Sequence, residues 1–195
     1  MITTLWLDLK TPKDMDIAVV SLFKAPVTNK YPHENMTVAQ VFGYIVGTRA
    51  KNATMHLRSI ENKAEARKFK GKSFDYVTPS GVFNYHSDAS LVSHSGLLCI
   101  DFDHVKDIHA LKTTLLHDPY FESELLFTSP SGDGIKWWVP IDIRKRPHEV
   151  WFKAMQNYLK ATYGLEADPQ CVNVSRACFL PYDPNCYVNP NICPY

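Results

Sequence analysis

The six-residue run Leu97–Phe102, LLCIDF, constrains the fold of this chain more than any other segment. Its length and apolar character predict a buried β-strand, which other elements of the fold must cover. Apolar residues then recur at helical spacing between Val105 and His117, and Asp118-Pro119 ends that helix. The sequence therefore predicts a buried strand that passes directly into a helix.

Three strands and a second long helix are expected after this unit. Their positions are Leu125–Thr128, Ile135–Ile143, Pro147–Gly164 for the helix, and Ala177–Leu180. The full order is strand, helix, strand, strand, helix, strand. This order predicts an α+β fold of the split βαβ type, as in ferredoxin-like and RNA-recognition-motif (RRM) domains.

The N-terminal third predicts a smaller α/β module. Residues 3–9 alternate as a strand does, Thr11-Pro12 offers a helix start, and a second helix is expected at Thr37–Val46. The run from residue 58 to 72 is polar and highly charged. It fits either a solvated helical face or a basic edge that contacts a phosphate backbone through four cations, Arg67, Lys68, Lys70 and Lys72.

Composition excludes several classes of protein. With 45% hydrophobic and 21% charged residues, the chain is typical of a soluble globular domain rather than a disordered or fibrous one. No apolar run reaches the ~18 residues of a membrane span, and the N-terminus lacks the pattern of a signal peptide. The net charge of +1 gives no general attraction for nucleic acid, so such a role needs a local basic patch.

The length of 195 residues predicts one domain, divided into an α/β module (1–75), an RRM-like core (76–185) and an extended tail (186–195). Since the chain ends within a proline-rich loop, we expect it to be the N-terminal part of a longer protein. An odd number of cysteines without secretory features predicts reduced thiols and a cytoplasmic location. Four of them are regularly spaced, but zinc ligands usually come in closer pairs, which favours buried thiols over a metal site at Cys171, Cys178, Cys186 and Cys193.

Asp101 and Asp103 end the buried strand and form the clearest candidate for a metal site. Side chains alternate along a strand, so both carboxylates point to one face, with Cα atoms ~6.6–6.8 Å apart. Two like charges beside apolar residues need a partner, and a cation that prefers oxygen, Mg²⁺ or Mn²⁺, suits them. The alternative is structural: one aspartate caps the following helix and the other pairs with a lysine.

The segment SPSGDGIK, which separates two of the expected strands, is a candidate phosphate-binding loop. Its backbone N–H groups can converge on an anion around two serines and two glycines, Ser129, Ser131, Gly132 and Gly134. Lys136 adds a positive charge at the start of the next strand. The same pattern also fits a tight hairpin turn with a surface lysine.

Asp168 and Arg176 form a third group, in the loop that follows the last helix. A guanidinium suits bidentate contacts with phosphate, whereas an ion pair between these two residues would only fix the loop. Combined with the other two features, they suggest a coherent set. The carboxylates bind metal, the metal binds a triphosphate, and the cations neutralise the phosphates.

The runs HSGLLCIDFDHV, FTSPSGDGIKWWVPI and DPQCVNVSRACFLPYDPNCYVNP, in this order, resemble the N-terminal domain of VirE-type (virulence-associated E) proteins of Bacteroides-type bacteria and their mobile elements. The resemblance covers roughly residues 40–190. VirE-type domains are similar to the archaeo-eukaryotic primase, or primase-polymerase, superfamily. Members of that superfamily have an RRM-like catalytic core packed against an N-terminal α/β module.

The resemblance implies a metal-dependent nucleotidyltransferase that binds nucleoside triphosphate and a DNA template in the replication of a mobile element or phage. It makes three carboxylates the catalytic ligands of Mg²⁺ or Mn²⁺, namely Asp101, Asp103 and Asp168. Ser131 and Lys136 become phosphate contacts, and Arg176 faces the triphosphate. VirE-type domains are often joined to a helicase-like ATPase, so such an ATPase is an expected partner in cis or in trans.

Lys136 departs from the wider superfamily, which has histidine at this position. Lysine keeps the positive charge but loses the directed hydrogen bonds of an imidazole, although VirE-type domains often carry lysine here. The alternative function is therefore a non-catalytic module that binds nucleic acid and recruits a helicase. Such a module would hold single-stranded DNA without a divalent metal and with a steep salt dependence.

Overall fold

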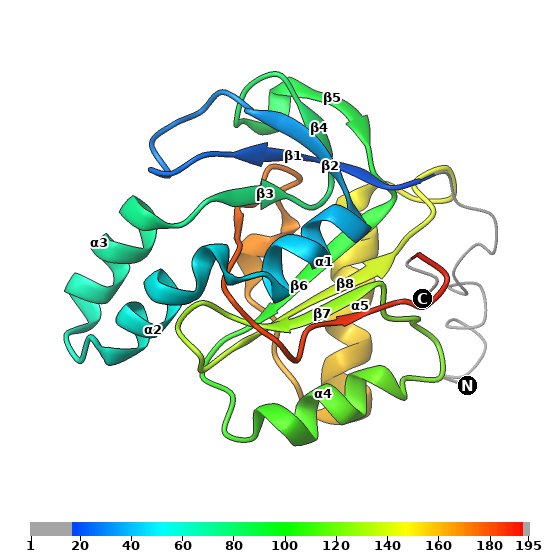
Figure 1. Ribbon diagram of the computed structural model, residues 1–195. Helices are drawn as coiled ribbons and strands as arrows, with labels where there is room; N and C mark the ends of the chain where they lie inside the picture. Colours follow the sequence, from blue (N-terminus) through cyan, green and yellow to red (C-terminus); the bar gives the residue numbers. More distant parts are fainter. Residues whose placement is uncertain (1–16, 193–195) are drawn as a thin grey trace.

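The computed structural model describes residues 17–192, so the expected strand at 3–9, the helix start at Thr11-Pro12 and Cys193 lie outside the described residues. Within this range the strands form two four-stranded sheets and one two-stranded sheet, flanked by helices (Figure 1). The strands of each sheet pair antiparallel. The architecture is mixed α+β, as the sequence predicts.

The core sheet has the order β10-β7-β8-β6, with bounds Tyr187–Val188, Leu125–Thr128, Ile135–Pro140 and Leu97–Phe102. All six residues of β6 are buried, which confirms the buried strand predicted from LLCIDF. β6 and β7 both pair with β8 and are connected through α4 (Ile108–Leu116). This part of the sheet is a split βαβ unit, with β8 between the two strands that the helix connects.

Two apolar layers cover the core sheet. One face packs against α4 and α5 (His148–Tyr163) in a cluster that includes Ile100, Trp137 and Phe152. α5 starts directly after Pro147 and ends at Gly164, whose φ of 66° is the left-handed conformation that favours glycine at a helix end. The opposite face packs against α1 and the N-terminal sheet.

The N-terminal sheet has the order β2-β1-β3-β9, with bounds Glu34–Thr37, Val19–Phe23, Tyr76–Thr78 and Cys178–Phe179. α1 (Val38–Val46) follows β2 and buries Val41 and Ile45 between the two sheets. Its first turn is a capping box, in which Thr37 and Gln40 accept hydrogen bonds from each other's backbone N–H groups. This confirms the helix that the sequence predicts at Thr37–Val46.

The last strand of the predicted core is placed differently from expectation. A strand forms at Cys178–Phe179, but it pairs with β3 in the N-terminal sheet, while β10 pairs with β7 at the other edge of the core sheet. The reason is packing at the N-terminal sheet, where Phe179 contacts the ring of Tyr76 and joins the cluster around Phe23. The order β7-β8-β6 agrees with an RRM-type core, but the last strand of that order is not formed beside β6, so the RRM-type topology is not confirmed.

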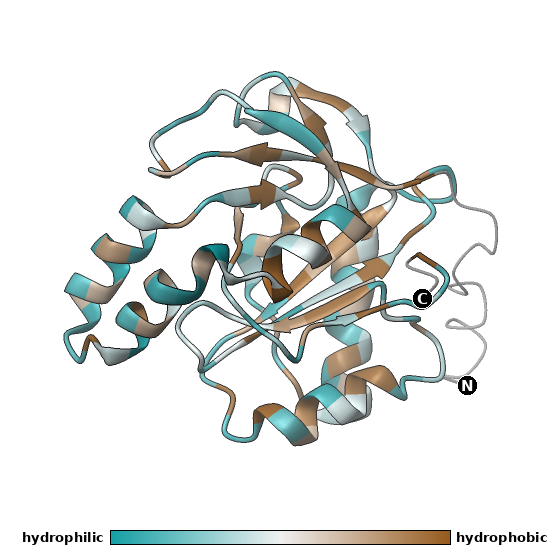
Figure 2. Cartoon of the chain, in the orientation of Figure 1, coloured by the Kyte–Doolittle hydropathy of each residue, from teal (hydrophilic) through white to brown (hydrophobic). Residues whose placement is uncertain are grey.

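Helices α2 (Lys51–Ser59) and α3 (Lys63–Ser73) lie on the outside of the molecule, at the left of Figure 1. They carry many hydrophilic residues, whereas the central strands are largely apolar (Figure 2). Asn62 caps α3 by accepting hydrogen bonds from two backbone N–H groups, and α3 buries no residue completely. The charged run at 58–72 thus spans the end of one helix and most of the next.

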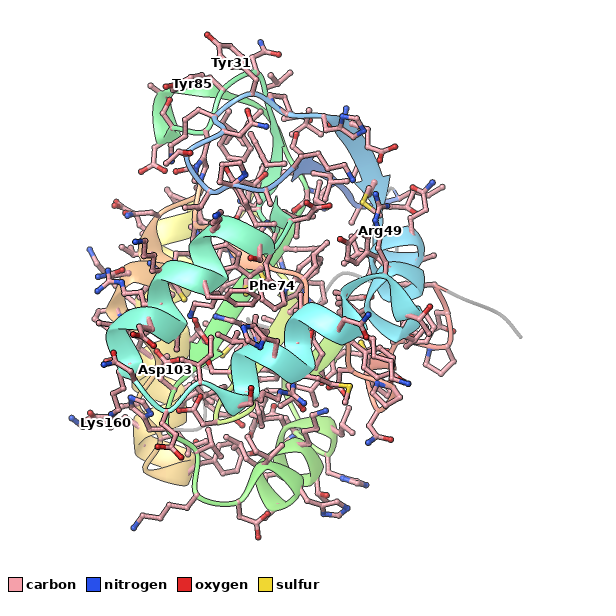
Figure 3. The ribbon with its side chains drawn as sticks, turned by 60° about the vertical axis from the view of Figure 1, so that its left-hand side comes forward. Tyr31, Arg49, Phe74, Tyr85, Asp103 and Lys160 are labelled. Carbon is pink, nitrogen blue, oxygen red and sulfur yellow. The ribbon has the colours of Figure 1, made fainter. Side chains whose placement is uncertain are left out.

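The remaining elements are short. A two-stranded sheet joins β4 (Gly81–Phe83) to β5 (Leu91–His94), and single 3₁₀ turns, η2, η3 and η4, span Thr48–Ala50, Asp88–Ser90 and Pro169–Val172. Tyr31 and Tyr85 form an edge-to-face pair at the tip of the molecule (Figure 3). In the described part of the chain, no helix has the length and apolar character that crossing a membrane requires.

Candidate functional site

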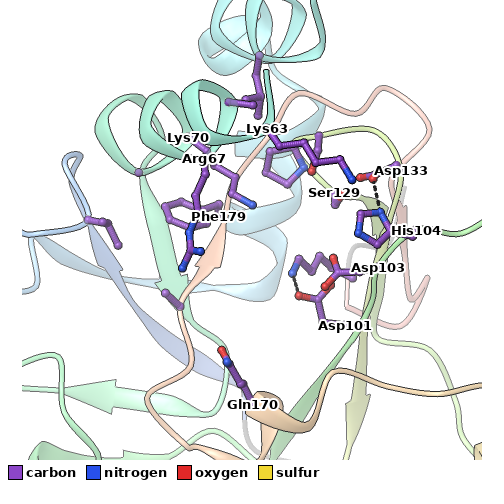
Figure 4. Close-up of a pocket in the computed structure, with 18 of the residues that line it drawn as sticks. Lys63, Arg67, Lys70, Asp101, Asp103, His104, Ser129, Asp133, Gln170 and Phe179 are labelled. Carbon is purple, nitrogen blue, oxygen red and sulfur yellow. Dashed lines mark hydrogen bonds and ion pairs between the residues drawn. The ribbon is translucent and has the colours of Figure 1, made fainter. Parts of the chain in front are cut away.

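A pocket of about 730 Å³ lies where α3, the end of β6, the β7–β8 loop and the segment after η4 meet (Figure 4). All three features singled out in the sequence contribute to its lining. The residues concerned are Asp101, Asp103, Ser129, Ser131, Lys136 and Arg176. The fold thus brings together groups that are far apart in the chain.

Asp101 and Lys136 form an ion pair at the inner end of this pocket. They are register partners on the antiparallel strands β6 and β8, so their side chains leave the sheet on the same face. Asp101 is only 3% exposed. Burial raises the pKa of Asp101, although Lys136 opposes this shift. Burial alone would lower the pKa of Lys136, but Asp101 outweighs it and raises that pKa, so the lysine stays charged.

In the structural alternative to a metal site, one of the two strand-end aspartates pairs with a lysine and the other caps the following helix. The Asp101–Lys136 pair matches the first part of this alternative. The second part is not observed, because Asp107 rather than Asp103 caps α4. Asp103 is exposed and lines the pocket beside Asp101 (Figure 4). One carboxylate is therefore buried and paired, while the other faces solvent.

Two buried polar atoms of the pocket lack hydrogen-bond partners among the described residues: Oδ1 of Asp101 and Oγ of Ser129. An unsatisfied buried polar group costs ~1–3 kcal/mol, so most folded proteins avoid it. Both atoms belong to residues that the sequence predicts as ligand contacts. A metal ion or a polar ligand in the pocket would satisfy them.

The β7–β8 loop is held from outside by Arg58, which the sequence did not indicate as a site residue. Nε of Arg58 donates to the carbonyl oxygen of Pro130, and Nη2 donates to that of Ser129, both at 3.2 Å. Gly132 has a φ of +86°, and a Cβ there would lie 2.9 Å from Nε of Arg58. At Gly134 a Cβ would lie 2.5 Å from the carbonyl oxygen of Phe102. Both glycines are therefore needed for this loop conformation.

Asp168 lies directly beside the buried strand. Its backbone N–H donates to the carbonyl oxygen of Asp101 at 2.9 Å, and its carboxylate pairs with Arg176. Ligand atoms of Asp101, Asp168 and Cys171 all lie within 4.8 Å of one another. Among the residues that the structure describes, Asp103 is not part of this group. The fold thus joins Asp101 to Asp168, with a cysteine as the third member.

Helix α3 supplies cations to the opposite wall of the pocket. Lys63, Arg67 and Lys70 follow one another at helical spacing and all line it, whereas Lys68 and Lys72 do not. Burial lowers the pKa of Lys70, and Lys136 lowers it further, while Asp103 and other acids oppose both effects. Two of the four predicted cations therefore reach the pocket, and Lys63 is a contributor that the sequence did not single out.

Two further features complete the pocket. His104 and Asp133, both exposed, form a hydrogen bond between Nδ1 and Oδ2 at 2.8 Å. The amine of Lys70 lies 5.8 Å from the ring centre of Phe179, within range of a cation–π contact. The pocket therefore combines acidic groups on one side with cations and an aromatic ring on the other.

The cysteines are free thiols in the described part of the chain: Cys99, Cys171 and Cys178 are buried and Cys186 is partly buried. The burial expected for these thiols is therefore observed at Cys171 and Cys178 and in part at Cys186. Within the same range, Cys171, Cys178 and Cys186 do not form a common group of metal ligands.

Residues 68–188 match the BT4734-like N-terminal domain family. This range covers more than half of the chain and contains the strand-end aspartates, the SPSGDGIK loop and the pair Asp168 and Arg176. The chain belongs to the BT4734-like N-terminal domain family. The family match begins inside α3, so Arg58, Lys63 and Arg67 precede it, while Lys70, Lys136 and Arg176 fall within it. No curated protein and no solved structure matches the chain significantly.

Proposed function

We propose that this pocket binds a nucleoside triphosphate together with Mg²⁺ or Mn²⁺, and that the domain is a primase-polymerase-like nucleotidyltransferase that acts on a DNA template. The observation that carries the proposal is the convergence of three sequence-distant features on one pocket whose opposite wall is cationic. The resemblance to VirE-type and primase-polymerase domains, with their role in the replication of mobile elements or phages, supports it independently.

The residues of the acidic side fit a divalent metal ion. Oδ1 of Asp101 is buried and unpartnered, Asp168 lies within ligand distance of it, and Asp103 faces the open pocket. Carboxylate oxygens are the ligands that Mg²⁺ and Mn²⁺ prefer. A bound divalent ion would supply electrostatic stabilisation to the phosphate oxygens as a 3′-hydroxyl attacks the triphosphate.

The chain's own cations would bind and orient the triphosphate. Lys63, Arg67 and Lys70 on α3 can neutralise phosphate oxygens from the wall opposite the carboxylates. Arg176 lines the same pocket and is held in place by Asp168 and Gln170. The hydroxyl of Ser129, free of other hydrogen bonds in the described chain, is positioned to donate to the same ligand. Lys136 contributes mainly by keeping Asp101 paired.

A second function is favoured by one specific observation. Asp101 and Asp168 are each paired with a cation of the chain already: Lys136 pairs with Asp101, and Arg176 pairs with Asp168. A site balanced in this way suits a non-catalytic module that binds nucleic acid and recruits a helicase-like ATPase. Such a module needs no metal.

A template-directed extension assay with Mn²⁺ and labelled nucleotides tests the proposal. The wild type should extend a primer or start a new strand, Asp101→Asn should lose this activity, and Arg49→Gln, outside the pocket, should keep it. Absence of extension, together with salt-sensitive binding of single-stranded DNA that EDTA leaves unchanged, would favour the recruitment module.

A further inference from the structure

We propose that Asp101, Asp168 and Cys171 together bind a divalent cation that has affinity for sulfur as well as oxygen, with Zn²⁺ as the representative ion. The inference rests on the proposed function for the role of a metal ion beside the pocket, and it assigns to Asp101 and Asp168 an ion of another class than Mg²⁺ or Mn²⁺. It differs from a three-carboxylate site because a cysteine replaces Asp103 as the third ligand.

The local backbone positions two of the three ligands. Asp168 is the N-cap of η4 and Cys171 lies three residues later, with the N–H of Cys171 donating to the carbonyl oxygen of Asp168 at 3.1 Å. Residues three apart in a 3₁₀ turn lie on the same side of it. The N–H of Asp168 donates in turn to the carbonyl oxygen of Asp101, which fixes η4 against β6. The ligand atoms therefore converge within 4.8 Å without any movement of the backbone.

The unpartnered oxygen of Asp101 is the second, independent observation. Asp101 is 3% exposed, and its Oδ2 is engaged by Lys136 on the neighbouring strand β8. The other carboxylate oxygen, Oδ1, has no hydrogen-bond partner in the described chain, and Asp101 offers a carboxylate oxygen within 4.8 Å of ligand atoms of Asp168 and Cys171. Cys171 is 2% exposed and its thiol is free. A buried carboxylate oxygen without a partner beside a buried thiol is accounted for by an ion between them.

The ligand chemistry selects the type of ion. Thiolate is a soft ligand that suits Zn²⁺, while Mg²⁺ requires oxygen ligands in near-octahedral geometry. Three protein ligands around Zn²⁺ leave a fourth position open, as in catalytic zinc sites. Lys136 and Arg176 offset part of the negative charge of two carboxylates and one thiolate. On binding, the thiol proton passes to the solvent.

Cobalt provides a direct test, because Co²⁺ occupies zinc sites and a thiolate ligand gives a sulfur-to-cobalt charge-transfer band in the near ultraviolet. Titration of the full chain with Co²⁺ should produce this band, and Zn²⁺ should remove it by displacement. Cys171→Ser, which keeps the shape of the side chain but replaces sulfur by the smaller oxygen, and Cys171→Ala should both abolish the band and weaken Zn²⁺ binding by at least about tenfold. The double variant Cys186→Ala/Cys193→Ala and Asp103→Asn should retain it.

Co²⁺ binding without a sulfur band, or a band that persists in Cys171→Ser, would overturn the inference. The result is separable from the fate of the proposed function. A sulfur band in a protein that binds no nucleotide would leave the metal site standing and remove the nucleotidyltransferase. Extension activity with Mg²⁺ and no sulfur band would leave the nucleotidyltransferase standing and remove the metal site with Cys171.

Discussion

Asp101 on β6 and Lys136 on β8 face each other as register partners, and their ion pair lines the pocket beside α3 and the β7–β8 loop. Both side chains are largely withdrawn from water, with 4% and 12% of their surfaces exposed. In such a setting, loss of one partner leaves the other charge buried and uncompensated. The pair is therefore both a structural element and the base of the candidate site.

The first prediction concerns this pair. Lys136→Met, which keeps most of the length of the side chain but removes its charge, should lower the free energy of unfolding by ~3–5 kcal/mol. The double variant Asp101→Asn/Lys136→Met should recover a large part of that loss, because no unpaired charge remains. Urea denaturation measures both, and a Lys136→Met variant as stable as the wild type would show that the pair carries no such energy.

A second prediction concerns Arg58, which holds the β7–β8 loop through two carbonyl oxygens. Arg58→Gln should weaken triphosphate binding by ~1–2 kcal/mol, since each of the lost hydrogen bonds is worth ~1 kcal/mol. Arg49→Gln is the matched control, because Arg49 stacks on Tyr44 and does not line the pocket. Calorimetric titration of both variants compares them directly, and equal affinities would mean that Arg58 does not position the loop.

The glycines of the chain supply a third prediction. Gly134→Ala places a Cβ 2.5 Å from a backbone oxygen of β6 and should lower the free energy of unfolding by ~1–3 kcal/mol. At Gly43, inside α1, a Cβ meets nothing within 4 Å, so Gly43→Ala should stabilise the protein by ~0.5–1 kcal/mol. Thermal unfolding of the two variants should therefore shift in opposite directions. Equal shifts would show that the loop tolerates a side chain at Gly134.

Local pattern predicts the elements around the core sheet well. β6 and β7 coincide with the apolar runs at Leu97–Phe102 and Leu125–Thr128, because an unbroken apolar run has few alternatives to a buried strand. α1 begins directly after its N-cap Thr37, close to the expected start, because capping depends on residues three positions apart. The motifs of the site are also local, so Asp101, Ser129 and Arg176 are identified before the fold is known.

Features that depend on distant contacts are not predictable in this way. The strand at Cys178–Phe179 is apolar enough for either sheet, and only its contact with Tyr76, far away in the chain, decides which one it joins. Arg58 and Lys63 look like ordinary residues of a charged helix surface. Their roles appear only when α2 and α3 are placed against the β7–β8 loop. Cys171 likewise gains significance from the position of Asp101.

A fourth prediction concerns pH and two histidines outside the pocket. The N–H of Gly96 donates to Nδ1 of His94 at 2.9 Å, so Nε2 of His94 carries the proton and faces Nδ1 of His148 at 3.1 Å. Burial, and then His148, lower the pKa of His94 from 6.5 to about 4. The unfolded state therefore binds the proton more readily, and the stability present above pH 6.5 falls as pH drops through about 4.

His94→Gln keeps a donor toward His148 but cannot titrate. Between pH 7 and 4.5, its free energy of unfolding should fall less steeply than that of the wild type. The two slopes of unfolding free energy against pH should differ by less than ~1.4 kcal/mol per pH unit, the value for one fully buried titrating group, because His94 is partly exposed. Urea midpoints at several pH values measure both slopes, and identical slopes would contradict the lowered pKa of His94.

The central claim, that the pocket binds a nucleoside triphosphate between carboxylates and the cations of α3, is tested most directly by calorimetric titration in the presence of Mn²⁺. Two variants carry the same change of charge on the same helix. Arg67→Glu/Lys70→Glu alters the pocket wall, and Lys68→Glu/Lys72→Glu alters residues outside it. The first should weaken binding by at least about tenfold, since one charge-assisted hydrogen bond is worth ~1.5–3 kcal/mol, while the second should stay close to the wild type. Equal losses of affinity in the two variants, or no binding by the wild type, would contradict the account.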